Sequence, residues 1–83
     1  MNERRRSPRT RTLRIGKILF NNRRSVIDCM VRNISRAGAC LVVPSVVGVP
    51  PEFDLVISGE AASHACRMIW HAENRIGVEF TRA

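Results

Sequence analysis

Hydrophobic and polar residues alternate with a period of two along much of the chain, which is the pattern of strands with one buried face. In the clearest stretch, Ile27, Cys29 and Val31 fall on one face. Asp28 and Arg32 fall on the other. Short turns rich in Asn, Gly and Pro separate such stretches. The pattern predicts six strands, at Thr12–Phe20, Ser25–Asn33, Ala39–Val43, Phe53–Ser58, Ser63–Ala72 and Arg75–Thr81.

No convincing helical stripe occurs, so the chain is predicted to be all-β. Six short strands with turns between them are typical of a small antiparallel barrel or sandwich. Closure into a barrel would remove the exposed edges of an open sheet. We therefore expect a small six-stranded antiparallel β-barrel over residues 12–83.

The segment before the barrel is polar and basic. Pro8 has no amide hydrogen and disfavours a helical residue before it, so we expect a flexible, extended arm over residues 1–11. Residues 1–24 contain nine Lys or Arg and one acidic residue, so the net charge of +7 is concentrated near the N-terminus. Thirteen of the 14 basic residues are arginine, which forms forked contacts with phosphate and with guanine edges. The composition predicts an anionic partner for this segment.

Composition also excludes several classes of protein. Eighty-three residues form one small domain without a large active-site cleft. Cys29, Cys40 and Cys66 cannot all pair within one chain, and none lies in a C-x-x-C motif, so a reducing cytoplasm is expected. No signal peptide follows the N-terminal charges, and Pro44 breaks the most apolar stretch, so we expect no membrane insertion. We find no nucleophile arrangement and no zinc-type ligand spacing, and therefore expect neither an enzyme nor a metal or cofactor.

Arginines spaced Arg-x-x-x-Arg form the first candidate motif. In an extended chain Arg5 and Arg9 point to the same side, roughly 13 Å apart at about 3.3 Å per residue. That span suits a ligand with two phosphates or two bases better than a single phosphate. A basic tail exposed to solvent is the alternative interpretation of this motif alone.

The second motif is Asn33-Ile34-Ser35-Arg36-Ala37-Gly38, at the end of the second predicted strand. Period two places Asn33 and Ser35 on one face, where an amide and a hydroxyl can form hydrogen bonds. Gly38 permits a positive φ and lets a ligand approach the backbone. Taken alone, the motif also fits an ordinary hairpin turn.

In this order and at this distance, the two motifs resemble the paired signature of the PilZ domain, the bacterial receptor for cyclic diguanylate (cyclic di-GMP). Ile69-Trp70 and Gly77-Val78-Glu79-Phe80 also resemble family positions, so the resemblance covers nearly the whole chain. It implies a PilZ-like barrel. Many members have a closing helix after the last strand, whereas this sequence ends two residues later at Ala83, so we expect little or no C-terminal helix.

The resemblance implies a role for each motif residue in the arm. Arg5 and Arg9 would bind phosphates and guanine edges. Arg4 and Arg6 would add charge and stack on a guanine.

It also implies roles for residues of the barrel. Asn33 and Ser35 would hydrogen-bond a guanine base, and Gly38 would keep the turn open. Trp70 matches a position where some members place a large side chain near the ligand. Arg36 lies inside the motif at a variable position and is a further candidate.

The function implied is that of a single-domain receptor that binds cyclic di-GMP and passes the signal, through ordering of the arm, to an unidentified protein partner. We expect a monomer or a weak homodimer. One alternative is a small basic barrel that binds nucleic acid, which the scarcity of aromatic residues (three Phe, one Trp, no Tyr) disfavours. The other is a protein-interaction module that has lost the ligand, which the intact arginines disfavour.

Overall fold

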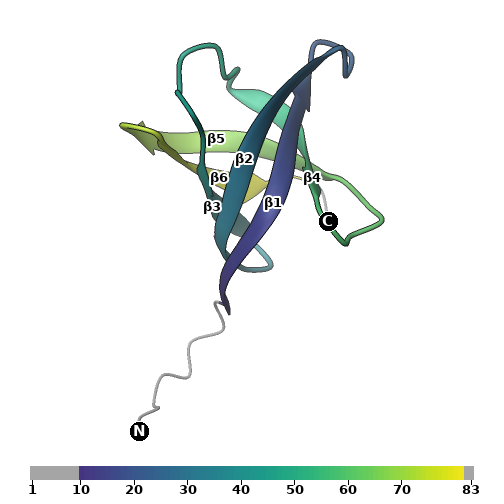
Figure 1. Ribbon diagram of the computed structural model, residues 1–83, viewed down its shortest axis with the longest axis vertical. Coiled ribbons are helices and arrows are strands. Elements are labelled where there is room, and N and C mark those ends of the chain that lie inside the picture. Colours follow the sequence, from purple (N-terminus) through teal and green to yellow (C-terminus); the bar gives the residue numbers. More distant parts are fainter. Residues whose placement is uncertain (1–9, 82–83) are drawn as a thin grey trace, which may run out of the picture.

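Six antiparallel strands close into a barrel in the order β1-β2-β3-β6-β5-β4 (Figure 1). The computed structural model describes residues 10–81, with side chains from Leu13 onward. Residues 10–81 contain no helix, so the predicted all-β barrel is confirmed. The strands are β1 (Thr10–Phe20), β2 (Ser25–Ile34), β3 (Gly38–Val42), β4 (Glu52–Ile57), β5 (His64–Ala72) and β6 (Arg75–Phe80).

The strand boundaries lie close to those predicted. β1 begins at Thr10, two residues earlier than expected and inside the segment assigned to the arm. The other predicted strand ends differ from the observed ones by no more than one residue. This agreement has a physical reason. A strand with one buried face alternates between apolar and polar residues over the length that contacts the core, so the alternation begins and ends close to the strand itself.

β1 and β2 form the longest hairpin and cross the barrel as a diagonal pair (Figure 1). Their turn contains three consecutive left-handed residues, Asn21, Asn22 and Arg23, with φ of 57°, 56° and 63°. Asn adopts this region at lower cost than most residues. On its other side β1 pairs with β4 from Gly16 to Leu19, and this ladder closes the barrel.

The barrel interior is filled by apolar side chains, and no polar side chain is buried among residues 13–81. Alternation in β4 and β6 is confirmed, because Leu55, Ile57 and Ile76 are fully buried. The full set of buried hydrophobic residues is Ile18, Cys29, Val31, Leu41, Val43, Phe53, Leu55, Ile57, Cys66, Ile76 and Val78.

β1 carries large apolar residues on both of its faces. Ile18 is fully buried, whereas Leu13 and Ile15 point outward and are 70% and 59% exposed. Gly16 is the inward-facing residue two positions before Ile18. A Cβ on Gly16 would lie 2.9 Å from a Val31 methyl group. The core therefore excludes a side chain at Gly16, while two large apolar residues remain on the surface.

Candidate ligand-binding site

The loop between β2 and β3 is a turn organised by the hydroxyl of Ser35. Its oxygen accepts hydrogen bonds from the amides of Ala37 at 3.2 Å and Gly38 at 3.3 Å. The hydroxyl also donates to the Gly38 carbonyl at 3.3 Å, and the Ser35 amide donates to the same carbonyl at 2.8 Å. A hydroxyl has one donor and two acceptor positions, so these contacts use all of them. Ser35 therefore fixes the shape of the turn.

Asn33 owes its position to a left-handed backbone rather than to strand alternation. Strict alternation from the buried Val31 would turn Asn33 into the barrel. Its φ of 50° breaks the alternation, at the point where the register of β1 and β2 also shifts. Asn33 is half-buried and lines a cavity on the outer surface together with Ser35. The two residues thus share a face as predicted, for a different reason.

Gly38 is required by packing and not by its φ. The left-handed glycines of residues 10–81 are Gly48 and Gly59, so Gly38 does not use the positive φ that a glycine permits. β3 pairs there with β6, and a Cβ on Gly38 would collide with the backbone carbonyl of Val78. The glycine lets the turn approach β6 closely.

Trp70 lies on the outside of the barrel, 46% exposed, although a single Trp on a strand is more often part of a core. A register shift between Met68 and Trp70 interrupts the alternation of β5, and Ile69 beside it is 58% exposed. The indole covers Gly77 of β6, where a Cβ would collide with the ring. Gly77 thus makes room for the indole to lie against the sheet.

These features converge on one open cavity of about 540 Å³ on the outer surface. Three predicted residues of the turn, Asn33, Ser35 and Gly38, form one side of it. Trp70 lines the same cavity from β5. Residues far apart in the sequence meet here because β3 pairs with β6, and β6 with β5. An aromatic face beside a polar turn is suited to a planar base with hydrogen-bonding edges.

Cys40 and Arg75 also line this cavity, although the sequence did not mark them as candidates. Cys40 is the register partner of Gly77, and Arg75 begins β6. Neither residue belongs to a motif. The pairing of β3 with β6 brings these residues to the cavity. It could have identified them, but it joins strands that are not consecutive in the sequence.

The arginines of the described region divide into two groups. Arg14, Arg23 and Arg67 form ion pairs with Glu60, Asp54 and Glu79, at 3.5, 3.1 and 2.9 Å. Within residues 13–81, Arg24, Arg32, Arg36 and Arg75 form no ion pair. Arg75 is the member of this second group that lines the cavity, and it supplies a positive charge beside Trp70.

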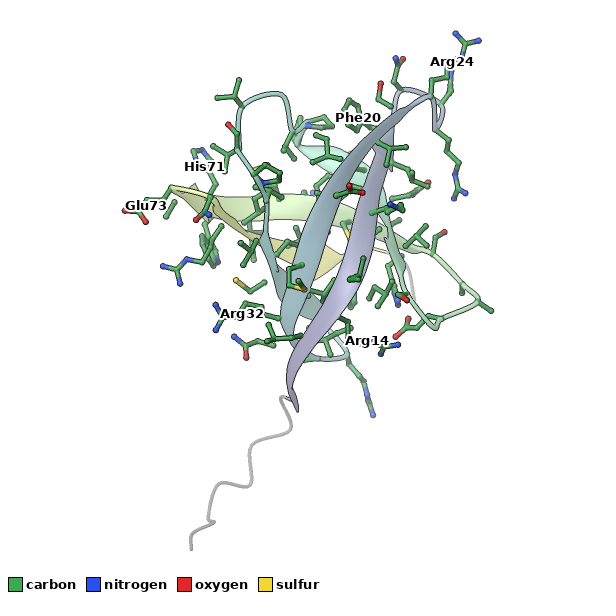
Figure 2. The ribbon with its side chains drawn as sticks, viewed as in Figure 1. Arg14, Phe20, Arg24, Arg32, His71 and Glu73 are labelled. Atoms are coloured by element: carbon green, nitrogen blue, oxygen red, sulfur yellow. The ribbon has the colours of Figure 1, made fainter. Side chains whose placement is uncertain are left out.

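Arg36 is exposed on the turn and does not line the cavity. Figure 2 shows Arg24 at the β1–β2 turn and Arg32 towards the opposite end of the same strands. Arg4, Arg5, Arg6 and Arg9, the candidate residues of the arm, lie outside the described residues.

A comparison with protein-family models matches residues 3–83 to the PilZ domain. The chain belongs to the PilZ domain family. The match spans both predicted motifs and nearly the whole sequence, and PilZ domains are binding modules rather than enzymes. A search of curated proteins finds no match.

Two of the three cysteines of this PilZ domain are buried thiols. Burial, aided by Asp28, raises the pKa of the Cys29 thiol to about 11. Burial, aided by Asp54, raises the pKa of Cys66 to about 12. Both thiols therefore stay protonated near neutral pH. Among residues 10–81, no three His, Cys, Asp or Glu residues cluster as metal ligands, and no helix could cross a membrane.

A second and larger cavity of about 640 Å³ lies beside the β1–β2 turn. Phe20 and Phe53 line it together with the Arg23–Asp54 ion pair. It contains none of the motif residues. We therefore place the candidate site of this PilZ domain at the smaller cavity, where motif residues and Trp70 meet.

Proposed function

We propose that this PilZ domain is a receptor for cyclic di-GMP. The observation that supports it is the convergence of Asn33, the Ser35 turn and Trp70 on one outer cavity. Cyclic di-GMP offers two guanine bases and two phosphates. The aromatic face, the polar turn and the arginines of the chain match these groups in kind.

The cavity would hold a guanine base. Trp70 stacks on the base, and Asn33 pairs with its edge through the amide. Ser35 acts as a positioning residue, because its hydroxyl is already engaged within the turn. Arg75 adds a charge at the rim that can contact a phosphate or a base edge.

The N-terminal arm would close the site. Arg5 and Arg9 bind phosphates and guanine edges, with Arg4 and Arg6 adding charge and stacking, and Arg36 is a further candidate at the turn. Each hydrogen bond to a charged group contributes about 1.5–3 kcal/mol, and stacking adds about 1–3 kcal/mol per base. After the cost of ordering the arm, a few such contacts reach micromolar affinity, about −8 kcal/mol.

We further propose that the ordered arm is the signal that a protein partner recognises. Hydrogen exchange of the amides at residues 1–11 tests this step. Cyclic di-GMP should slow their exchange, because binding fixes the arm on the barrel. Equal exchange with and without bound ligand would exclude this route of transmission while leaving binding intact.

Fluorescence of the single Trp tests the site itself. Stacking of guanine on Trp70 should quench its emission in a saturable way on addition of cyclic di-GMP. A barrel that binds nucleic acid should behave differently. It should bind single-stranded RNA with an affinity that falls steeply as the salt concentration rises, and its fluorescence should not respond to cyclic di-GMP. That outcome would overturn the proposal.

A further inference from the structure

The outer face of the β1–β2 hairpin is unusually apolar for a surface. Leu13 and Ile15 of β1 are 70% and 59% exposed, and Val26 and Met30 of β2 are 52% and 38% exposed. All four lie on the outward side, opposite the buried positions of the same strands. Large exposed apolar residues gathered on one face mark an interaction surface.

The residues of this face form four cross-strand rows. The strand register pairs Leu13 with Arg32, Ile15 with Met30, Lys17 with Asp28, and Leu19 with Val26. We call these eight residues the hairpin face. Its charged row is an ion pair of 2.7 Å between Lys17 and Asp28, whose side chains are 53% and 74% exposed. Apolar rows lie on both sides of this pair.

We propose that the hairpin face binds a second copy of this chain through a twofold axis. The proposed axis runs parallel to the strands, midway between β1 and β2. Rotation about it places each β1 residue of one copy opposite a β2 residue of the other copy, and that β2 residue is the one with which it pairs in register within its own chain. Lys17 of one copy then faces Asp28 of the other, and Asp28 faces Lys17.

The same operation matches the apolar rows. Ile15 faces Met30, and Leu19 faces Val26, across an interface of two sheets packed about 10 Å apart. In the outermost row Leu13 packs on the aliphatic stem of Arg32. The face is therefore complementary to itself in charge and in hydrophobicity, which is why a second copy fits it better than an unrelated partner.

The size of the face sets the strength of the dimer. Seven residues of each strand extend over about 23 Å at about 3.3 Å per residue. Stable interfaces of standard size bury about 800 Å² on each partner, and two short strands lie at the lower end of that range. A hollow beside Ile15 and Met30, bordered by Pro44, adds room for a side chain of the other copy. We expect a dimer that forms and dissociates with concentration.

Charge reversal provides a test that depends on the proposed axis. Lys17→Glu makes the charged row wholly acidic and Asp28→Lys makes it wholly basic, so each variant alone places like charges opposite each other. Each should raise the dissociation constant of the dimer about tenfold or more. An equimolar mixture of the two variants should restore association, because the acidic row of one variant then faces the basic row of the other.

Sedimentation equilibrium of the full chain over a wide range of concentration gives these constants. Val47→Asp is the matched control, since Val47 is 83% exposed on the β3–β4 loop and is not one of the eight residues of the hairpin face. It should leave association unchanged. A wild-type chain that stays monomeric, a mixture that fails to associate, or an equal loss in the control would each overturn the proposal. The first outcome would assign the face to a different partner. The wild-type measurement decides the question even if a variant fails to fold.

Discussion

Two glycines near the candidate site lie against neighbouring atoms that leave no room for a side chain, and these neighbours differ in kind. A Cβ on Gly38 would meet the rigid backbone carbonyl of Val78, whereas a Cβ on Gly77 would meet the indole of Trp70, which can rotate away. The cost of an added methyl group depends on how far its neighbour can move. These positions therefore separate a backbone constraint from a side-chain constraint.

The first prediction compares alanine at both glycines. Gly38→Ala should lower the free energy of unfolding by about 2–3 kcal/mol, because β3 and β6 must separate to admit the methyl group. Gly77→Ala should cost about 1 kcal/mol and shift the emission of Trp70, because the ring is displaced. Urea unfolding and fluorescence spectra measure the two effects.

A Trp70→Ala background is the control for Gly77. Once the indole is removed, Gly77→Ala should be neutral or stabilise by about 0.5 kcal/mol, since Ala is less flexible than Gly in a strand. An unchanged cost in this background would show that the indole is not what excludes a side chain at Gly77.

At the same scale, the sequence predicted which residues belong to the site better than it predicted what each residue does there. Spacing singled out Asn33, Ser35 and Gly38, and the structure brings all three to one cavity. The left-handed φ of Asn33 and the normal φ of Gly38 were not predictable, because they depend on a register shift and on close packing against β6. Arg75 was missed because its place in the cavity depends on long-range pairing.

At the scale of elements, the turn between β2 and β3 holds one wall of the cavity. Ser35→Ala removes three hydroxyl contacts of 3.2–3.3 Å. It should lower the free energy of unfolding by about 1 kcal/mol and weaken cyclic di-GMP binding, because the turn loses its shape. Urea unfolding and ligand titration test both effects.

Ser35→Thr keeps the hydroxyl and is the matched control. It should retain most of the stability and binding that Ser35→Ala loses. Equal losses in the two variants would mean that the size of the side chain, and not its hydrogen bonds, sets the turn.

Alternation predicted the six strands well because each strand has one face in the core. Alternation does not identify the buried face where that condition fails. In β1 the apolar residues Leu13 and Ile15 lie outside, and the inward position beside them is a glycine. In β5 a register shift leaves the consecutive residues Ile69 and Trp70 exposed. Neither feature has a local signal, because both depend on how neighbouring strands pack.

At the scale of the whole molecule, the buried thiols couple stability to pH. Cys29 and Cys66 have pKa values raised to about 11 and about 12, against 9.0 for an unburied thiol. Above pH 9 the unfolded chain loses these protons before the folded chain does. The contribution of the two protonated thiols to stability should therefore be fully present below pH 9. From pH 9 towards 11–12 the free energy of unfolding should fall, by up to about 1.4 kcal/mol per pH unit for each thiol.

Urea unfolding of the wild type and of Cys29→Ala between pH 7 and 11 measures this dependence. The variant should show a smaller decrease than the wild type, because one raised thiol is absent. Identical slopes in the two proteins would contradict the assignment of the pH dependence to Cys29.

The central claim is that this PilZ domain binds cyclic di-GMP at the cavity with the help of its arm, and isothermal titration tests it most directly. The wild type should bind with micromolar or better affinity. Arg9→Ala should abolish or greatly weaken binding with the fold intact, since a phosphate contact is lost. Arg24→Ala removes the same charge at the β1–β2 turn, away from the cavity, and should bind as the wild type does (Figure 2). A folded wild-type chain that releases no heat of binding, supported by a negative result in equilibrium dialysis, would contradict the claim.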